Sequence, residues 1–398
     1  MSEIETTLRE VCEHLAPIDE TPCSAGEREA AEWIVDRLGR AGVPEVALED
    51  EPSWGTFPPT ALALGLLGMA GCAAVALNRR ATGVALALTS VVGVLDEAEN
   101  GPRVFRRALR KRRTTVNVVA RAGDPDAART LVLLAHHDGA QTGVLYDQSM
   151  FIAINKRFPG VLQRFKTQPP QWAVGVAGQL LAVGAAITGK RSRAVRGLAI
   201  NALGVALIAD IARSPTVPAA NDNLSAVAAL VAIAERLRDQ PITGLRVLLV
   251  SAGAEETLQD GIRGFIARHR DELDHEGTWI LNMDTIGSPR LIMLEAEGPF
   301  VMQEYTDPGF RDLIEQCARE QEIPLERGFR ARASTDSVIT SRAGYPSTCL
   351  GSLNEWQQMS NYHQLSDVPE NLDYGTIASA ARLVYAVGEA IAAGRAGR

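Results

Sequence analysis

Five segments of this sequence each contain a residue that can bind a metal ion. The segments are LVLLAHHDGA (131–140), PAANDNLSAV (218–227), VLLVSAGAEE (247–256), WILNMDTIG (279–287) and NEWQQMSNYHQLSD (354–367). Three of the segments are short apolar runs that stop at His, Asp or Glu. Strands that deliver polar side chains at their carboxyl ends are how open α/β sheets build active sites. Two His and three carboxylates delivered in this way form a mixed nitrogen and oxygen ligand set, which suits Zn²⁺.

The adjacent carboxylates Glu255 and Glu256 follow an apolar strand. Because neighbouring side chains point in different directions, one carboxylate can bind a metal while the other faces an attacking water and transfers its proton. The alternative is an ordinary acidic helix N-terminus, which the helix dipole favours.

His136, His137 and Asp138 follow another strand. The carboxylate of Asp138 can accept the far N–H of a ligand imidazole two residues away and fix its tautomer. We therefore expect His136 to be a ligand, Asp138 to orient it and His137 to be a neighbour. The alternative is a surface turn in which the His residues have no role.

Three other candidate ligands each have an ordinary alternative. Asp222 stands just before a helix, where Asp is a preferred N-cap, although a carboxylate can also bridge two metals. Asp284 ends the strand WILNMD, and it could serve only to form the turn that follows. His363 lies in a polar loop, where a single His seldom binds a metal.

Alternating strands and helices predict a sheet sandwiched between helical layers, an α/β fold. We expect TTVNVVAR (114–121) and the strand 130–135 to form a β-hairpin or neighbouring strands that lead to His136. The further elements expected are two helices within 1–42, strands at 46–51, 245–251, 278–283 and 346–350, and helices at 224–238, 309–321 and 374–393.

The composition limits the classes of function. The formal net charge of −8 argues against a nucleic-acid partner. The five Cys are scattered without a CxxC pair, which fits a reducing compartment and excludes a Cys-rich zinc module. The N-terminus is polar and acidic, so we expect no secretory signal peptide there.

The motifs AHHD, NDNLSA, AGAEE, NMDTIG and NYHQLSD resemble those of the dinuclear-zinc aminopeptidases of the aminopeptidase Y and bacterial leucyl aminopeptidase type. The resemblance covers about 114–393, except for one insertion, plus the N-terminal helices. It implies a three-layer α/β/α zinc-exopeptidase fold with a mixed central sheet. It also implies two Zn²⁺ per chain and a peptide substrate.

The resemblance assigns roles residue by residue. It implies that Asp222 bridges both zinc ions. His136 and Asp284 would complete one metal site, and Glu256 and His363 the other. Glu255 would act as general base and acid. The family often has His after the position of Asp336, but Ser337 stands here, so the role of Asp336 stays unassigned.

Two largely apolar insertions depart from the family pattern, and we expect each to form a helical hairpin with a basic tip. The chain then divides into 1–51, 103–138 and 218–398 of the catalytic domain, with insertions at 52–102 and 139–217. Uncharged segments 59–77 and 172–189 are long enough to span a bilayer, whereas 81–95 and 197–209 are short.

We expect membrane contact through 59–95 and 172–209, with the catalytic domain on the cytoplasmic side. The alternative is a soluble, cytoplasmic protein whose insertions form a helical cap over the site. Orientation is poorly determined, because basic residues lie both at the tips and at 103–113.

The sequence therefore predicts a zinc-dependent exopeptidase that removes the N-terminal residue of peptides. One rival is a carboxypeptidase, a dipeptidase or another amide hydrolase on the same scaffold. Others are a non-catalytic membrane scaffold and a solute-binding role for the hairpins, which the near absence of polar residues in them disfavours. The sequence does not determine the oligomeric state.

Overall fold

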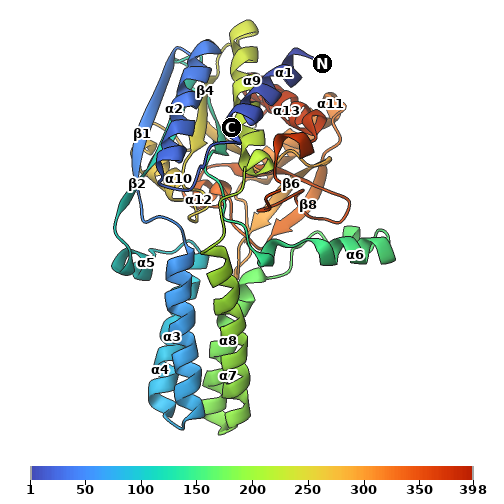
Figure 1. Cartoon of the computed structure of the whole chain (residues 1–398). Coiled ribbons are helices and arrows are strands. Elements are labelled where there is room, and N and C mark those ends of the chain that lie inside the picture. The colour runs from blue at the N-terminus through green and yellow to red at the C-terminus, as the bar shows by residue number, and fades with distance from the viewer. Residues whose placement is uncertain (1, 397–398) are drawn as a thin grey trace.

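The computed structural model describes residues 2–396. Figure 1 shows an α/β head, which contains both chain ends, and a narrow bundle of four helices that projects from it. We call this bundle the stalk. Its helices are α3 (Pro58–Ala76), α4 (Arg80–Ala98), α7 (Val174–Thr188) and α8 (Arg191–Ile211).

The head is organised around one mixed sheet. Within residues 2–396 it has nine strands, in the order β1-β2-β4-β3-β5-β9-β6-β7, with β8 paired to β6. Strands β3, β4, β5 and β9 are parallel, whereas β1, β2 and β6 join them through antiparallel pairings. The strands are β1 (Glu45–Ser53), β2 (Arg113–Gly123), β3 (Thr130–His136), β4 (Arg246–Ala252), β5 (Thr278–Met283), β6 (Arg290–Glu297), β7 (Gln303–Glu304), β8 (Glu326–Ala331) and β9 (Ser347–Leu353).

Helices cover both faces of this sheet, so the predicted three-layer arrangement is confirmed. The main apolar core lies between the sheet and one helical layer, formed by α1 (Glu3–Leu15), α2 (Ala25–Arg40), α9 (Ser225–Asp239), α11 (Pro308–Glu320) and α13 (Tyr374–Ala392). A second core lies under α10 (Asp260–His269) and α12 (Asp336–Arg342) on the opposite face. Side chains on the parallel strands are buried on both faces, which explains why these strands read as continuous apolar runs.

The predicted pairing of the first two strands before His136 was wrong. β4 lies between β2 and β3, antiparallel to the former and parallel to the latter. The turn at Gly123 suggested a hairpin, but the sheet inserts a strand from much later in the chain. Pairing with β4 on one side and β5 on the other places β3 in the middle of the sheet, where helices cover both of its faces.

The stalk helices differ in length from the uncharged segments. Helix α7 begins only after Pro170 and has 15 residues, fewer than the predicted spanning segment 172–189. Helices α4 and α8 have 19 and 21 residues because they continue through flanking charged residues. Three helices, α3, α4 and α8, are long and apolar enough to cross a membrane, and α7 is a shorter apolar helix.

Both insertions leave the head at one edge of the sheet. Strand β1 runs parallel to β3 and β4, so its carboxyl end lies at the same edge as theirs, and α3 follows it. The second insertion follows the carboxyl end of β3 directly. It contains α6 (Ser149–Arg157), which extends sideways at the base of the stalk (Figure 1), and the short turns η1 (Val144–Tyr146), η2 (Leu162–Arg164) and η3 (Gln171–Ala173). The stalk therefore stands at the edge where polar side chains follow the strands.

Candidate metal centre

The ends of three adjacent parallel strands bring candidate ligands to one place. His136 is the last residue of β3, and Asp284 follows β5 immediately. Glu255 and Glu256 lie in the loop between β4 and α10, so they do not form a helix N-terminus. The carboxyl ends of neighbouring parallel strands share one sheet edge, and this proximity is therefore a consequence of the topology.

Asp222 lies between two groups of candidate ligands. Its Oδ1 is 3.3 Å from Nε2 of His136, and its Oδ2 is 3.2 Å from Nε2 of His363. Ligand atoms of His136, Asp222 and Asp284 lie within 4.8 Å of one another, and so do those of Asp222, Glu256 and His363. The structure thus brings all five predicted ligands together, in the two groupings that the resemblance implied. The atoms of His136, Glu255 and Glu256 form a third such group.

Asp222 is not a helix cap. It lies in η4 (Ala220–Leu224), a kinked turn with non-helical backbone angles at Asp222, and Leu224 occupies the N-cap of α9. The carboxylate of Asp367 accepts the backbone N–H of Asn221 at 2.7 Å and that of Asp222 at 3.1 Å. These bonds hold the turn, so that the carboxylate of Asp222 is free to face the imidazoles.

Asp138 contacts His136, as predicted, and also holds a group that was not predicted. Nδ1 of His136 lies 3.2 Å from the backbone carbonyl oxygen of Asp138 and 3.5 Å from its carboxylate. The two carboxylate oxygens accept the backbone N–H groups of Glu255 and Glu256, at 2.9 and 3.0 Å. Asp138 therefore orients His136 through its main chain and fixes the acidic loop through its side chain. His137 belongs to none of the ligand groups, and its Nδ1 lies 2.9 Å from Oγ of Ser251.

Glu255 is oriented by an amide that the sequence analysis did not identify. Nε2 of Gln259 donates to Oε1 of Glu255 at 2.6 Å and to the carbonyl oxygen of Ser334 at 2.8 Å. Glu255 is 8 % exposed. One carboxylate oxygen is thus fixed, which leaves the other to face the metal centre.

The buried carboxylates raise one another's pKa values. Burial raises the pKa of Glu255 well above its ordinary value, and the charge of Glu256 adds to this effect. Burial and the neighbouring Asp222 raise the pKa of Asp284 to about 6. Burial acts on Asp222 in the same direction, but the close contacts of its carboxylate with the imidazoles of His136 and His363 outweigh burial and lower its pKa. Each carboxylate that lacks an imidazole partner is therefore costly to ionise here.

The donor set fits cations. Within the described residues, the ion pairs of Asp222 and Glu256 involve only His136 and His363, and no Lys or Arg balances the cluster. Neither ring nitrogen of His363, although buried, has a hydrogen bond of good geometry, and neither does either carboxylate oxygen of Asp336. Buried charges are normally paired or bind metals, so the arrangement supplies ligands for one or more divalent ions.

Two aromatic residues near His363 were missed. The ring of Tyr362 stacks on His363 with centroids 3.9 Å apart, and the ring of Tyr146 meets it edge-on at 4.4 Å. Thr285 was also missed, and its hydroxyl donates to Asp284 at 2.8 Å. Tyr146 belongs to the second insertion, where no sequence signal connected it with the site. Tyr362 and Thr285 were detectable only as immediate neighbours of proposed ligands.

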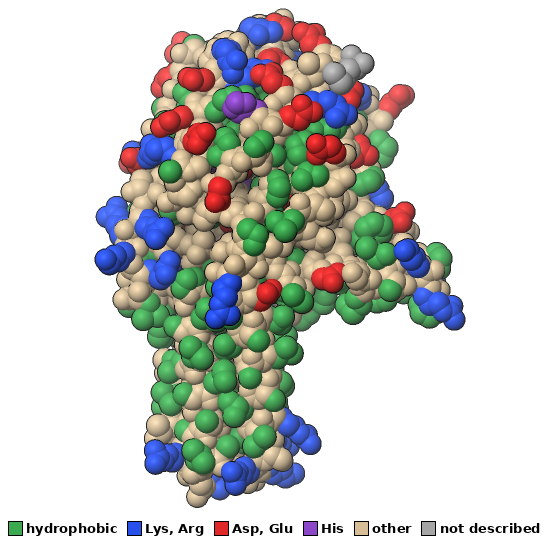
Figure 2. Space-filling view, viewed as in Figure 1, with side chains coloured by type: hydrophobic (Ala, Val, Ile, Leu, Met, Phe, Trp, Pro, Cys, Tyr) green, Lys and Arg blue, Asp and Glu red, His purple; other side chains and the backbone are tan. Residues whose placement is uncertain are grey.

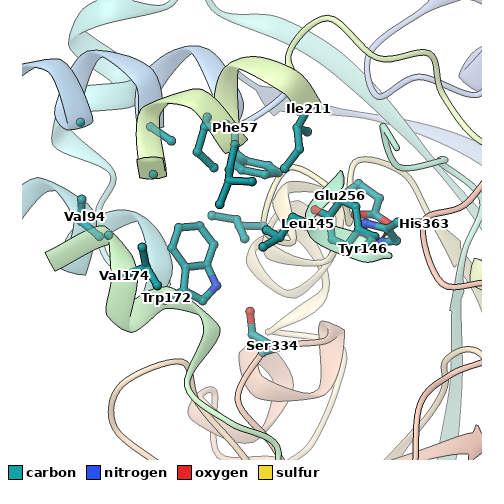
Figure 3. A pocket seen from close by; sticks show the side chains of 18 of the residues that line it. Phe57, Val94, Leu145, Tyr146, Trp172, Val174, Ile211, Glu256, Ser334 and His363 are labelled. Atoms are coloured by element: carbon teal, nitrogen blue, oxygen red, sulfur yellow. Dashed lines mark ion pairs between the residues drawn. The ribbon is translucent and has the colours of Figure 1, made fainter. Parts of the chain in front are cut away.

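An apolar cavity adjoins the metal centre. Glu255, Glu256 and His363 line its inner end, and helices α3 and α8 of the stalk line its outer part. Figure 3 shows Glu256, His363 and Tyr146 grouped at one end, with Trp172 and Val174 toward the other. Among the described residues, no Lys or Arg lines this cavity or two further cavities that touch the ligands.

Comparison with known proteins agrees with this geometry. Residues 197–388 match the family described as peptidase family M28. No curated protein matches the sequence. The fold is similar to that of the aminopeptidase from Aneurinibacillus sp. strain AM-1, at 12% identity and a TM-score of 0.54, over 96% of this chain and 92% of that chain.

Other structures of the same fold have different activities. A Zn-dependent exopeptidase from Parabacteroides distasonis is 13% identical with a TM-score of 0.53, over 96% of both chains. A glutaminyl cyclase from Bacteroides thetaiotaomicron is 12% identical with a TM-score of 0.54, over 97% of both chains. At such identities these structures establish the fold alone. Together with the family match over residues 197–388, they agree with the resemblance to zinc-dependent exopeptidases that the five motifs indicated.

Proposed function

We propose that this protein is a zinc-dependent aminopeptidase that removes the N-terminal residue of peptides. The observation that carries the proposal is the position of Asp222, whose two carboxylate oxygens face two different imidazoles. Such a carboxylate can bridge two ions. Mixed His and carboxylate ligands at this spacing are typical of zinc, and paired ions are found in aminopeptidases.

In this proposal each side chain has a defined task. His136 and Asp284 would hold one ion, Glu256 and His363 would hold the other, and Asp222 would contribute to both. When bound, the ions would polarise the scissile carbonyl and acidify a water molecule. Glu255 receives the proton of that water and delivers it to the departing amine. Its raised pKa in the unloaded cluster reflects burial among carboxylates, which bound cations would offset.

The charge of the site favours an aminopeptidase over a carboxypeptidase. A substrate's C-terminal carboxylate is best bound by Arg or Lys, but the three cavities at the metal centre have neither in their linings. A free α-amino group instead matches surroundings rich in carboxylate. The same cavities therefore support an N-terminal substrate.

We also propose that the stalk spans a membrane. Helices of 19 to 21 residues are about 28 to 32 Å long at 1.5 Å per residue, which matches a hydrocarbon core about 30 Å thick. Figure 2 shows that the stalk surface is largely apolar between a basic tip and the head. The tip carries Arg79, Arg80, Lys190, Arg191, Arg193 and Arg196. A soluble cap would have no reason to expose so many apolar side chains.

We propose that the head lies on the cytoplasmic side. Exposed basic residues gather where the stalk meets the head, on α5 (Val104–Leu109), on the segment that follows it and on α6. They include Arg107, Lys111, Arg112, Arg113, Lys156 and Arg157. Excess Lys and Arg beside spanning helices favours the cytoplasmic side, although the tip is basic as well. Ser192 lies at the stalk tip, on the opposite side of the membrane from the head in this orientation. A Ser192→Cys variant is treated with a maleimide that does not cross membranes. Labelling in intact cells would support the orientation, and labelling only after lysis would overturn it.

The proposed activity is tested with purified full-length protein in detergent. Zinc should be measured by mass spectrometry, and hydrolysis followed on amino-acid anilides, N-acetylated anilides and a peptide with N-terminal Gln. Near two zinc ions per chain with cleavage only of free-amine substrates would support the aminopeptidase. Ammonia release from the Gln peptide without peptide-bond cleavage would instead indicate a cyclase, and cleavage only of acylated substrates another amidase.

Membrane insertion needs its own test. Membranes from cells that express the full chain are washed with alkaline carbonate, which removes peripheral proteins. Retention in the pellet and release only by detergent would support a spanning stalk. Recovery in the carbonate supernatant would favour the soluble cap.

A further inference from the structure

The cavity beside the metal centre combines two regions of the chain that the family activity does not connect. Its inner end contains Glu255, Glu256 and His363, together with Tyr146 and Tyr362. Its outer wall comes from the upper ends of the stalk helices. The wall residues are Ala61 and Gly65 on α3, Val94 on α4, Val174 and Gly175 on α7, and Asn201, Gly204, Val205, Leu207, Ile208 and Ile211 on α8.

Beyond the ligands this cavity offers no charged group. The only charged carboxylates in its lining are Glu255 and Glu256, and no Lys or Arg contributes. Trp172, Phe57 and Leu145 add apolar surface between the stalk and the ligands, as Figure 3 shows. Gln259 and Ser334 in the lining hydrogen-bond each other, and Asn201 is the polar lining residue on the stalk helices. A substrate group that enters the outer part therefore meets mainly apolar surface, which favours an apolar group.

Glycines keep the outer part open. Gly65, Gly175 and Gly204 come from three different helices and all line the cavity. A Cβ at Gly204 would meet nothing closer than Val174 Cγ1 at 3.9 Å, so a larger side chain there has room to enter the cavity. At Gly65, in contrast, a Cβ would come within 2.7 Å of Val205 Cγ2, so α3 and α8 touch at that level and the open space lies beside Gly204.

We propose that this cavity binds a long apolar chain next to the scissile amide, so that the substrate is an amphipathic, membrane-borne amide. This inference rests on the proposed function, since the amide must reach the metal centre. The apolar chain lies against the ends of the stalk helices that line the cavity, and the polar end faces Glu255 and Glu256. A stalk surrounded by lipid would let such a substrate approach without leaving the apolar phase.

The test is a homologous series of substrates. Full-length protein loaded with zinc is assayed in detergent on anilides of straight-chain 2-amino acids, with side chains of one to eight carbons. Each methylene buried should raise kcat/KM about fourfold until the cavity is filled. A flat series, with alanine anilide cleaved as well as the longest member, would overturn the inference and leave the aminopeptidase standing.

A cavity-filling variant and a matched control separate cavity binding from micelle effects. Gly204→Leu should remove most of the gain for the eight-carbon substrate, about tenfold or more, while cleavage of alanine anilide changes less than twofold. Gly184→Leu is the control, because Gly184 lies on α7 outside the cavity lining and a Cβ there would meet nothing within 4 Å. If Gly204→Leu fails to fold, Ala61→Leu probes the opposite wall. Equal effects of the cavity and control variants would overturn the inference.

A second arm distinguishes the two sources of such a chain, a peptide side chain and a fatty-acyl group. N-acyl amino acids with acyl chains of two to ten carbons are assayed in parallel. Chain-length dependence only in this arm, with the same loss in Gly204→Leu, would support the cavity and overturn the aminopeptidase. If neither series is cleaved by zinc-loaded protein, both the proposed function and the inference fail.

Discussion

The head and the stalk depart from ordinary exposure rules in opposite ways. In the head, Asp138, Asp222, Glu255 and Asp336 are carboxylates no more than 8 % exposed, without a Lys or Arg to balance them. In the stalk, large apolar side chains stand in the open, among them Leu66 at 55 %, Val92 at 60 %, Leu203 at 58 % and Ile187 at 79 % exposed. A buried charge needs a counter-ion, and exposed apolar surface needs an apolar phase. The difference suggests that each region is completed by something outside the chain.

Buried ion pairs connect the two regions. Arg106 pairs with Glu97 at the end of α4 and donates to the carbonyl oxygen of Thr257, which follows Glu256. Arg103 pairs with Asp260 at the start of α10. The base of the stalk is therefore tied to the loop that carries the acidic ligands, so a change in either region can be followed in the other.

The largest expected effect comes from removing the shared ligand. Asp222→Ala should lower kcat/KM about 10³-fold or more and release bound zinc, because both ligand groups lose a member. Zinc content by mass spectrometry and anilide hydrolysis measure this. Asp271→Ala is the matched control, since its side chain is 97 % exposed and does not line the cavities at the metal centre. Full zinc content and activity in Asp222→Ala would contradict the proposed centre.

The second effect separates the two adjacent glutamates. Glu255→Gln should lower kcat about 10²- to 10⁴-fold and keep its zinc, because the proton acceptor is lost while the ligands remain. Glu256→Gln should lose zinc as well as activity. Since Glu255 also belongs to a possible ligand group with His136, zinc loss in Glu255→Gln would make it a ligand and not the base.

A third prediction concerns the stalk alone. Gly178 and Gly197 bring α7 and α8 so close that a Cβ on either would collide with the other's carbonyl oxygen. Gly197→Leu should therefore destabilise the bundle by about 1 to 3 kcal/mol, whereas Gly184→Leu should have little effect. Thermal unfolding in detergent measures both variants. Equal melting temperatures for the two would show that this helix contact is not tight.

The smallest expected effect is on the stability of the head, where His269 is already paired with two carboxylates. His269 lies 2.9 Å from carboxylates of both Glu49 and Glu272, and the hydrogen bond to Glu49 is the main cause of its raised pKa. A raised imidazole pKa stabilises the fold fully below the unfolded value of about 6.5, and this contribution is lost as pH rises through the folded value. His269→Gln should thus cost about 1 kcal/mol more at pH 6 than at pH 9 in denaturant unfolding. A difference independent of pH would indicate that His269 stabilises by packing only.

Local patterns predicted many elements well. Strand β5 has the predicted bounds, and α9, α11 and α13 lie within a residue of theirs, because apolar periodicity and caps such as Asp307 are local signals. The absence of charged side chains also predicted the two apolar hairpins, but it did not predict the lengths of their helices. Charged residues such as Arg191 continue α8, whereas Pro170 delays α7. The ends of these helices therefore do not coincide with the ends of the uncharged segments, because backbone conformation sets the ends of a helix.

The sequence by itself determined the ligand types, their positions after apolar strands and the uncharged character of the future stalk helices. Only the tertiary structure decided that β4 separates β2 from β3, that Asp138 holds the acidic loop and that Gln259 orients Glu255. It alone also placed stalk helices against the metal centre. Periodicity reflects contacts between near neighbours in the chain, whereas strand order and converging side chains depend on packing between distant segments. That packing is fixed only when the whole sheet and both helical layers form together.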